Sequence, residues 1–191
     1  IDAFYRTGAS GVAISVLSVA LACYAIAHLV ERATGSRPAA ALSVAMFGLN
    51  PDVLYLQSTP MTEPLLFGLT LLAISLVYDW VEIESDRRSH AGTPDTAGLP
   101  ADLSTEALTA EVEARRSRAK AGWLLVAACL TRYEAWFVTA TALSLAAIAL
   151  WRRGRSASDA LTSASQLAMY PLLAIIGFLV HSWFTTGDWF V

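Results

Sequence analysis

Two acidic residues and one arginine, each beside a long apolar segment, are the side chains in this sequence best suited to chemistry. Glu63 directly precedes the apolar run 64–83, and Arg132 and Glu134 stand between two further apolar runs. Ionisable groups at the edge of a bilayer are costly, so each is a candidate functional group. A carboxylate can accept a proton or bind a metal ion, and a guanidinium can grip a phosphate with two parallel hydrogen bonds.

Both Glu63 and Arg132 also have ordinary structural explanations. Thr62 can cap a helix that starts at Glu63, where Pro64 is tolerated and an acid suits the helix dipole. The sequence leaves this explanation and a functional one open for Glu63. An arginine can anchor a helix at the membrane surface, but Glu134 two positions later favours a charged cluster that faces a cavity. We therefore interpret Arg132 as a functional residue and Glu134 as the residue that orients it.

Five further residues near the same predicted loops are candidates for substrate binding: Arg6, Asp52, Tyr55, Gln57 and Tyr133. Each of them also has a simpler explanation. Asp52 follows Asn50 and Pro51 and is typical of a turn, while aromatic and amide side chains are common at a membrane interface. The histidines His28 and His181 are better explained by hydrogen bonds within a helical bundle than by catalysis.

The elements that must position these residues are membrane helices. The chain has 191 residues, of which 55% are hydrophobic and 15% charged, whereas soluble domains carry about 25% charged residues. We predict an all-α, polytopic transmembrane bundle with about six membrane segments, at 11–30, 38–49, 64–83, 121–131, 135–151 and 167–184. The segments 38–49 and 121–131 are short, at roughly 18 Å of helix. Because each leads into a loop with candidate residues, they predict a cavity level with the lipid headgroups.

The basic residues predict the orientation of the bundle. Eleven of the thirteen lie in three alternate loops: Arg32, Arg37, Arg87, Arg88, Arg115, Arg116, Arg118, Lys120, Arg152, Arg153 and Arg155. Cytoplasmic loops are enriched in lysine and arginine, so both termini, the loop 50–63 and the turn 132–134 are expected to face outward. Trp80, Trp123, Trp136, Trp151 and Trp183 lie near segment ends and predict an interfacial belt.

We expect three parts along the chain. Residues 1–84 form a first membrane half with the outer loop 50–63, residues 85–120 a cytoplasmic insert, and residues 121–191 a second membrane half. Within the insert, 89–103 is linker-like and 104–120 is predicted as a helix capped by Ser104 or Thr105. The abrupt start at Ile1 leads us to expect a piece of a longer polytopic protein.

The motifs around the candidate residues resemble those of a known enzyme class. LNPDVLYLQSTPMTEPLL, followed by LTRYEAWF, is similar to the integral-membrane glycosyltransferases of the GT-C class. More narrowly, it resembles bacterial relatives of the dolichyl-phosphate-mannose protein mannosyltransferases and the aminoarabinose transferase. The matching positions are Met61-Thr62-Glu63-Pro64, Leu130-Thr131-Arg132 and the closing stretch 183–188. The acidic first outer loop of that class has no anchored counterpart, since only IDAFYRTG precedes the first segment.

The resemblance implies a function and a location. It implies an inverting, mannosyltransferase-like enzyme of the bacterial inner membrane that moves a sugar from a polyprenyl phosphate to an acceptor on the non-cytoplasmic side. The acceptor would be a protein, a glycan or a lipid, and no nucleic acid is expected. Arg132, or a divalent metal held by carboxylates including Glu63, would offset charge on the leaving phosphate.

Two other classes of protein stay open. In a transporter, Glu63, Arg132 and Glu134 would line a permeation path, but charged residues would then be expected throughout the membrane depth. Here nearly all of them lie at segment ends, with Asp79 late in the segment 64–83. The second alternative is a non-catalytic or truncated membrane subunit.

Overall fold

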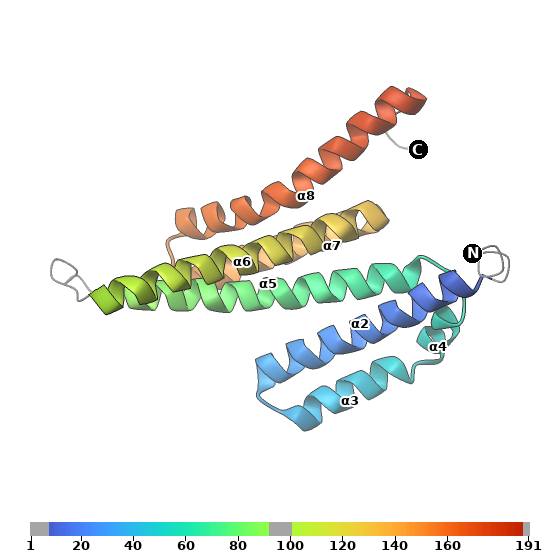
Figure 1. Cartoon of the computed structure of the whole chain (residues 1–191), viewed down its shortest axis with the longest axis horizontal. Coiled ribbons are helices and arrows are strands. Elements are labelled where there is room, and N and C mark those ends of the chain that lie inside the picture. The colour runs from blue at the N-terminus through green and yellow to red at the C-terminus, as the bar shows by residue number, and fades with distance from the viewer. Residues whose placement is uncertain (1–7, 92–100, 189–191) are drawn as a thin grey trace.

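The computed structural model of the chain describes residues 8–91 and 101–188, and all of its regular elements there are α-helices. The helices pack as an elongated bundle (Figure 1). They are α2 (Ala9–Thr34), α3 (Arg37–Gly48), α4 (Pro51–Gln57), α5 (Glu63–Ala91), α6 (Ala101–Thr131), α7 (Glu134–Arg152) and α8 (Ala157–Thr186). The prediction of an all-α fold is confirmed.

The expected number of about six membrane segments was too high. Within the described ranges, α2, α5, α7 and α8 are long and apolar enough to cross a membrane, and α3 with α4 makes a fifth span only if this pair, bent by 67°, counts as one. The bend follows from Asn50 and Pro51. Proline disfavours helical geometry in the residue before it, and the Asn50 side chain instead accepts a hydrogen bond from the Asp52 N–H at 2.9 Å, which starts α4.

The predicted insert helix and the fourth apolar segment are a single helix. α6 runs without interruption from Ala101 to Thr131, so the expected boundary at residue 120 falls inside it and the expected cap at Ser104 or Thr105 was wrong. No proline interrupts this stretch, which is rich in alanine, glutamate, arginine and leucine. α6 is not among the candidate spans, because four basic residues lie just before its apolar part.

The helices alternate in direction, so the loops gather at two ends. α2, α5 and α7 run one way and α3, α6 and α8 the other (Figure 1). The turns after α2 and α7 therefore lie at one end with most of the described basic residues, and the turns before α5 and α7 lie at the opposite end. This arrangement agrees with the predicted sorting of charge.

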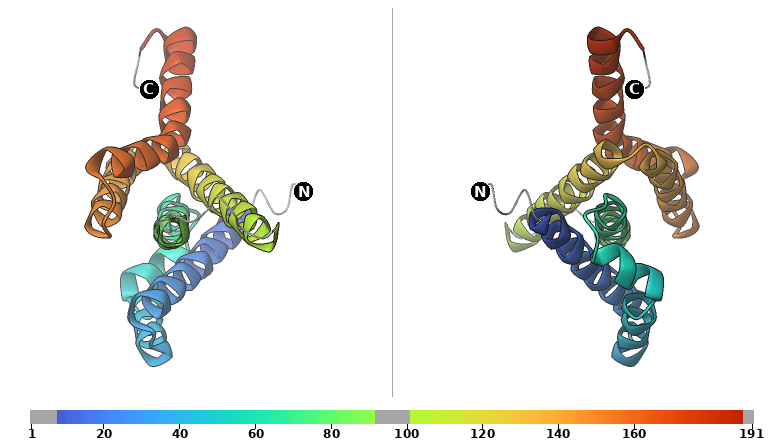
Figure 2. Two further views of the ribbon diagram at one scale, coloured as in Figure 1. Left: turned by 90° about the vertical axis from the view of Figure 1, so that its left-hand side faces the viewer. Right: turned by 90° about the vertical axis from the view of Figure 1, so that its right-hand side faces the viewer.

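α5 is the central helix of the bundle. An end view shows it with α2 and α3 on one side and α6, α7 and α8 on the other (Figure 2). Small residues allow α2 and α5 to approach closely, since a Cβ added at Gly68 would lie 2.7 Å from the carbonyl oxygen of Ser18. On the other side, Trp80, Leu125, Leu150 and Leu167 form the core between α5, α6, α7 and α8. Trp80 is 1% exposed, so it belongs to this core and not to an interfacial belt.

α8 diverges from the bundle over its second half. It changes direction along its length (Figure 1), and Pro171 lies inside it. Proline removes one helical hydrogen bond and is a common cause of such bends. Beyond this point Leu172, Leu173 and Phe184 are exposed, which suits a helix surface that contacts lipid.

Candidate functional site

Arg132, Glu63 and Glu134 form one ion-pair cluster between the start of α5 and the turn that joins α6 to α7. Arg132 Nη1 donates to Glu63 Oε1 at 2.7 Å, across 69 residues of sequence. Its Nε and Nη2 donate to the two oxygens of Glu134 at 3.1 and 2.9 Å. The pairing with Glu134 is a two-bond fork, which fixes the plane of the guanidinium group. The structure thus brings together the three residues that the sequence marked as catalytic candidates.

Local structure around the α6–α7 turn holds Arg132 in place. The Trp136 indole N–H donates to the carbonyl of Cys129 at 3.0 Å, which ties the first turn of α7 to the last turn of α6. The N–H of Ala135 donates to the carbonyl of Arg132 at 3.2 Å, so α7 begins directly after the arginine. Arg132 therefore lies in a short, well-bonded turn and points toward α5.

The loop before Glu63 is anchored on α2. The Ser15 hydroxyl donates to the carbonyl of Thr59 at 2.7 Å. Pro60 packs so closely on Gly11 that a Cβ there would lie 2.5 Å from the Pro60 Cβ. The Leu66 N–H then donates to the Thr62 carbonyl at 3.0 Å, which starts α5 with Glu63 in its first turn. Contacts to α2 and the first turn of α5 thus set the position of this carboxylate.

The cluster carries a net charge of −1 with the carboxyl groups ionised, because two carboxylates share one guanidinium. Hydrogen bonds to Glu134 and then to Glu63 raise the pKa of Arg132 further above its ordinary value. The side chains are partly exposed, at 30% for Arg132, 40% for Glu63 and 42% for Glu134. A solute can therefore reach all three, but an incoming phosphate must compete with a carboxylate for the arginine.

An apolar groove begins within one helical turn of this cluster. It lies between α5 and α7, has a volume of about 310 Å³, and is lined by Ile74, Phe137, Val138, Thr141, Ala142 and Leu145. Phe137 comes three residues after Glu134, and Leu145 lies about 16 Å from Glu134 along the helix axis. A charged cluster above an apolar groove is suited to a ligand with a polar head and a hydrocarbon tail.

The predicted substrate-binding residues lie around the cluster without joining it. Asp52 and Tyr55 are on exposed positions of α4, and Gln57 is at the C-terminal end of that helix. Tyr133 is 66% exposed and lies between Arg132 and Glu134 in sequence. No described hydrogen bond or ion pair connects these four side chains to Arg132 or to the two glutamates. Arg6 lies outside the described residues.

The cluster does not have the composition of a metal site. Glu63 already accepts a hydrogen bond from Arg132, and within residues 8–91 and 101–188 no group of three His, Cys, Asp or Glu side chains is placed to hold an ion. A metal bound by Glu63 would share its ligand with a cation, which opposes binding. The divalent metal stays a prediction from the resemblance, and the proposed sugar transfer does not require it.

Sequence analysis did not identify two polar networks near the opposite end of the bundle. In the first, His28 Nδ1 lies 2.9 Å from the hydroxyl oxygen of Ser75, and His28 Nε2 lies 3.6 Å from Asp79. Ser75 is 1% exposed, so this Ser-His-Asp arrangement has no access for a substrate. It agrees with the structural role expected for His28. In the second network, Arg155 donates to Glu84 at 2.7 Å, and both are buried. The only feature of the sequence that pointed to this second network is Glu84, which directly follows the apolar run 64–83.

No protein-family model, curated protein or solved structure matches the chain. The assignment of a function therefore depends on the residues and on their geometry.

Proposed function

We propose that the chain belongs to a membrane glycosyltransferase that moves a sugar from a polyprenyl-phosphate donor to an acceptor on the non-cytoplasmic side of the membrane. The observation that carries this proposal is the 2.7 Å contact between Arg132 and Glu63. This contact supports the proposal because a guanidinium can bind phosphate and a carboxylate can bind hydroxyl groups.

The apolar groove supports a lipid-linked donor. In such a donor the reactive sugar carbon is joined to a phosphate that is itself joined to a hydrocarbon chain. The cluster of Glu63, Arg132 and Glu134 would take the phosphate and sugar, and the groove that starts at Phe137 would take the first isoprene units. By the resemblance described above, the membrane is the bacterial inner membrane and the cluster faces away from the cytoplasm.

The residues have distinct roles in this mechanism. The acceptor oxygen attacks the sugar carbon, and the bond from that carbon to the phosphate oxygen breaks with its electron pair on the phosphate. Arg132 stabilises the negative charge that develops there. Glu63 accepts a hydrogen bond from the acceptor hydroxyl, orients it, and takes its proton as the new bond forms. Glu134 holds the guanidinium plane until the phosphate binds.

Substitutions at Arg132 and Glu63 test the proposal. Membranes that contain the full-length protein with Arg132→Ala should transfer sugar from a polyprenyl-phosphate sugar about 100- to 1,000-fold more slowly, since a charge-stabilising donor is lost. Glu63→Gln should reduce transfer about 100-fold or more. Protein level and protease resistance should stay near wild type in both. Transfer at the wild-type rate in both variants would refute the proposal.

The control is Ser144→Ala, which changes an exposed side chain on α7 that lies outside both the cluster and the lining of the groove. We expect close to normal transfer, because this change removes only a hydroxyl group.

A transporter is the second candidate, and the chain of Arg32, Asp79, His28 and Ser75 between α2 and α5 favours it. Polar side chains inside membrane spans often mark a path for ions or substrates. The same membranes distinguish the two candidates. A transporter would move labelled substrate across vesicles without forming a glycosidic bond, and this movement would depend on His28 rather than on Arg132. A non-catalytic subunit would do neither.

A further inference from the structure

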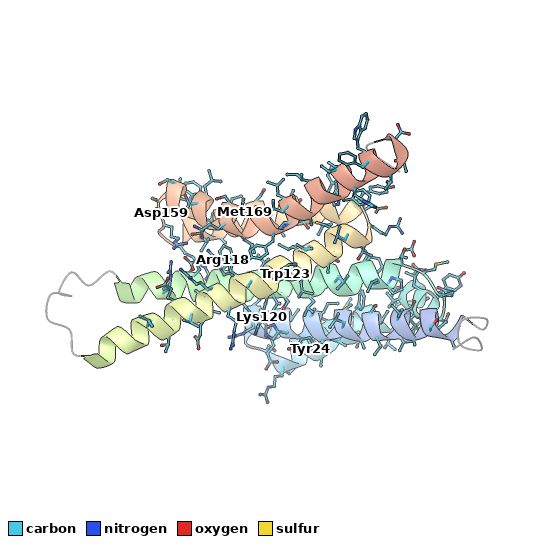
Figure 3. The ribbon with its side chains drawn as sticks, turned by 45° about the horizontal axis from the view of Figure 1, so that its top comes forward. Tyr24, Arg118, Lys120, Trp123, Asp159 and Met169 are labelled. Atoms are coloured by element: carbon cyan, nitrogen blue, oxygen red, sulfur yellow. The ribbon has the colours of Figure 1, made fainter. Side chains whose placement is uncertain are left out.

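A cavity lies at the opposite end of the bundle from Arg132. It is bounded by α5, α6 and α8 and has a volume of about 430 Å³. Its lining residues are Glu84, Arg87, Glu111, Ala114, Arg115, Arg118, Arg155, Asp159, Thr162, Ser163 and Gln166. Figure 3 shows Arg118 on α6 and Asp159 at the start of α8 at this end of the molecule.

The lining of this cavity is predominantly cationic. Four arginines face three acids, so its formal charge is +1 (4 − 3). Ser163, Thr162 and Gln166 add neutral hydrogen-bonding groups. Guanidinium groups beside hydroxyl groups are the usual partners of phosphate in proteins.

The arginine side chains in the wall of the cavity give further support for an anionic ligand. The side chain of Arg155 is 6% exposed, and it donates through Nη2 to Glu84 at 2.7 Å and through Nη1 to Ser163 at 2.8 Å. Its Nε is buried without a hydrogen-bond partner, and so is Nε of Arg87. A buried donor without a partner is unfavourable, and the positive charge of these guanidinium groups at the wall favours an anion in the cavity.

The cavity lies where three apolar helix segments end. The apolar run of α5 ends at residue 83, just before Glu84. The apolar part of α6 begins at residue 121, just after Arg118, and that of α8 begins at residue 167, just after Gln166. Trp123 and Trp151, on α6 and α7, are exposed near the same level, as residues at a membrane interface commonly are. The cavity is therefore level with the lipid headgroups.

We propose that this cavity binds a phosphate-bearing anion. Arg118 and Arg115 contact the phosphate from α6, and Arg87 and Arg155 form the inner wall. The headgroup of an anionic lipid and a free phosphate share this chemistry, and basic pockets at the membrane boundary commonly hold anionic lipid headgroups. The site is independent of the proposed sugar transfer, because it lies at the other end of the bundle.

The test measures the thermal unfolding midpoint of the full chain in an uncharged detergent at fixed ionic strength. The three probes are phosphatidylglycerol, phosphatidylcholine and inorganic phosphate, each titrated separately. We expect phosphatidylglycerol to raise the midpoint and phosphatidylcholine to leave it unchanged. In Arg118→Gln, about tenfold more phosphatidylglycerol should be needed for half of the shift, because one charge-assisted contact is lost.

Arg116→Gln is the matched control, since Arg116 lies on the same helix and is exposed outside the cavity lining. It should respond as the wild type does. Arg115→Gln, whose side chain is 72% exposed, provides a second test if Arg118→Gln folds poorly. A shift with inorganic phosphate alone would support the site and assign it to a free phosphate. No shift with either anion, or equal shifts in all variants, would overturn the proposal.

Discussion

Arg132 is bound to two acids, and this sets the charge that a donor meets at the proposed site. Glu134 contributes two hydrogen bonds and Glu63 one, so the cluster is negative while both acids are ionised. An anionic donor is attracted by the guanidinium and repelled by the carboxylates. Because these charges are exposed to water, the attraction and the repulsion are both weak and oppose each other. The carboxylate of Glu134 therefore weakens binding of the anionic donor, and in exchange it orients the guanidinium group of Arg132.

Glu134→Gln tests this balance. The change removes one negative charge and keeps one oxygen that can accept from Arg132. We expect the KM for a polyprenyl-phosphate sugar to fall about three- to tenfold, in line with one exposed pairwise charge interaction. The measurement is initial transfer rate against donor concentration in membranes.

Glu134→Asp is the control, because it keeps the charge and should not lower KM. A KM for Glu134→Gln that equals or exceeds the wild-type value would contradict the proposed role of Glu134.

The proximity of Glu63 and Arg132 could be predicted because both border helices at the same end of an alternating bundle. The way Glu134 occupies two donors of Arg132 could not, since the path of the turn depends on the bond from Trp136 to Cys129. The sequence also could not predict that Asp52 and Tyr55 lie apart from the cluster. It depends on the bend at Asn50 that sets the direction of α4.

Among the elements, α2 and α5 are held together by close packing of small residues as well as by the polar contacts of His28 and Arg32 with α5. Ala22 and Ala25 are buried on α2, and Gly68 lies against the backbone of α2 at Ser18. Close backbone contact over small residues is a common source of helix association in membranes. Because α2 also anchors the loop before Glu63, loosening this contact should affect the proposed site as well.

Gly68→Val tests the contact between the two helices. A Cβ at this position would be 2.7 Å from the Ser18 oxygen, so the helices must separate. Overpacking of this kind typically destabilises a protein by about 1–3 kcal/mol. We expect a lower unfolding midpoint in detergent, measured by circular dichroism.

Gly177→Val is the matched control, because a Cβ there has no neighbour within 4 Å. Both changes replace a glycine inside a helix by the same β-branched residue, so their intrinsic helix propensities cancel. Equal midpoints for the two variants would show that the α2–α5 contact contributes nothing specific.

Hydropathy predicted where apolar segments lie better than where helices end. The run 135–151 corresponds to α7 with one more residue at each end, whereas α5 continues well past the run 64–83, to Ala91. The predicted boundary at residue 120 was wrong, because the helix α6 continues from its polar part into its apolar part without interruption. Hydropathy changes at this position, but helix propensity does not. The run 38–49 corresponds closely to α3, but it contributes a membrane span only if α3 and α4 count as one bent span.

Over the whole molecule, charge is distributed unevenly between the two ends. One end holds Arg132 with two acids, and the other holds the cationic cavity with the buried pair of Arg155 and Glu84. In a bilayer the basic end is expected to face the cytoplasm. This orientation would place the proposed transfer site on the outer face and the proposed phosphate site at the inner leaflet, so a single measurement of sidedness bears on both.

Cysteine labelling measures this sidedness. Ser58 and Ser156 are exposed at opposite ends of the bundle, after α4 and before α8. In intact cells a membrane-impermeant maleimide should label Ser58→Cys and leave Ser156→Cys unlabelled until the membrane is permeabilised. The native thiols provide a low background, because Cys129 is buried and Cys23 is partly buried, so the reagent has limited access to them. If Ser156→Cys reacts first, the basic end faces outward. The proposed transfer site would then lie on the cytoplasmic side, where the glycosyltransferase proposal fails.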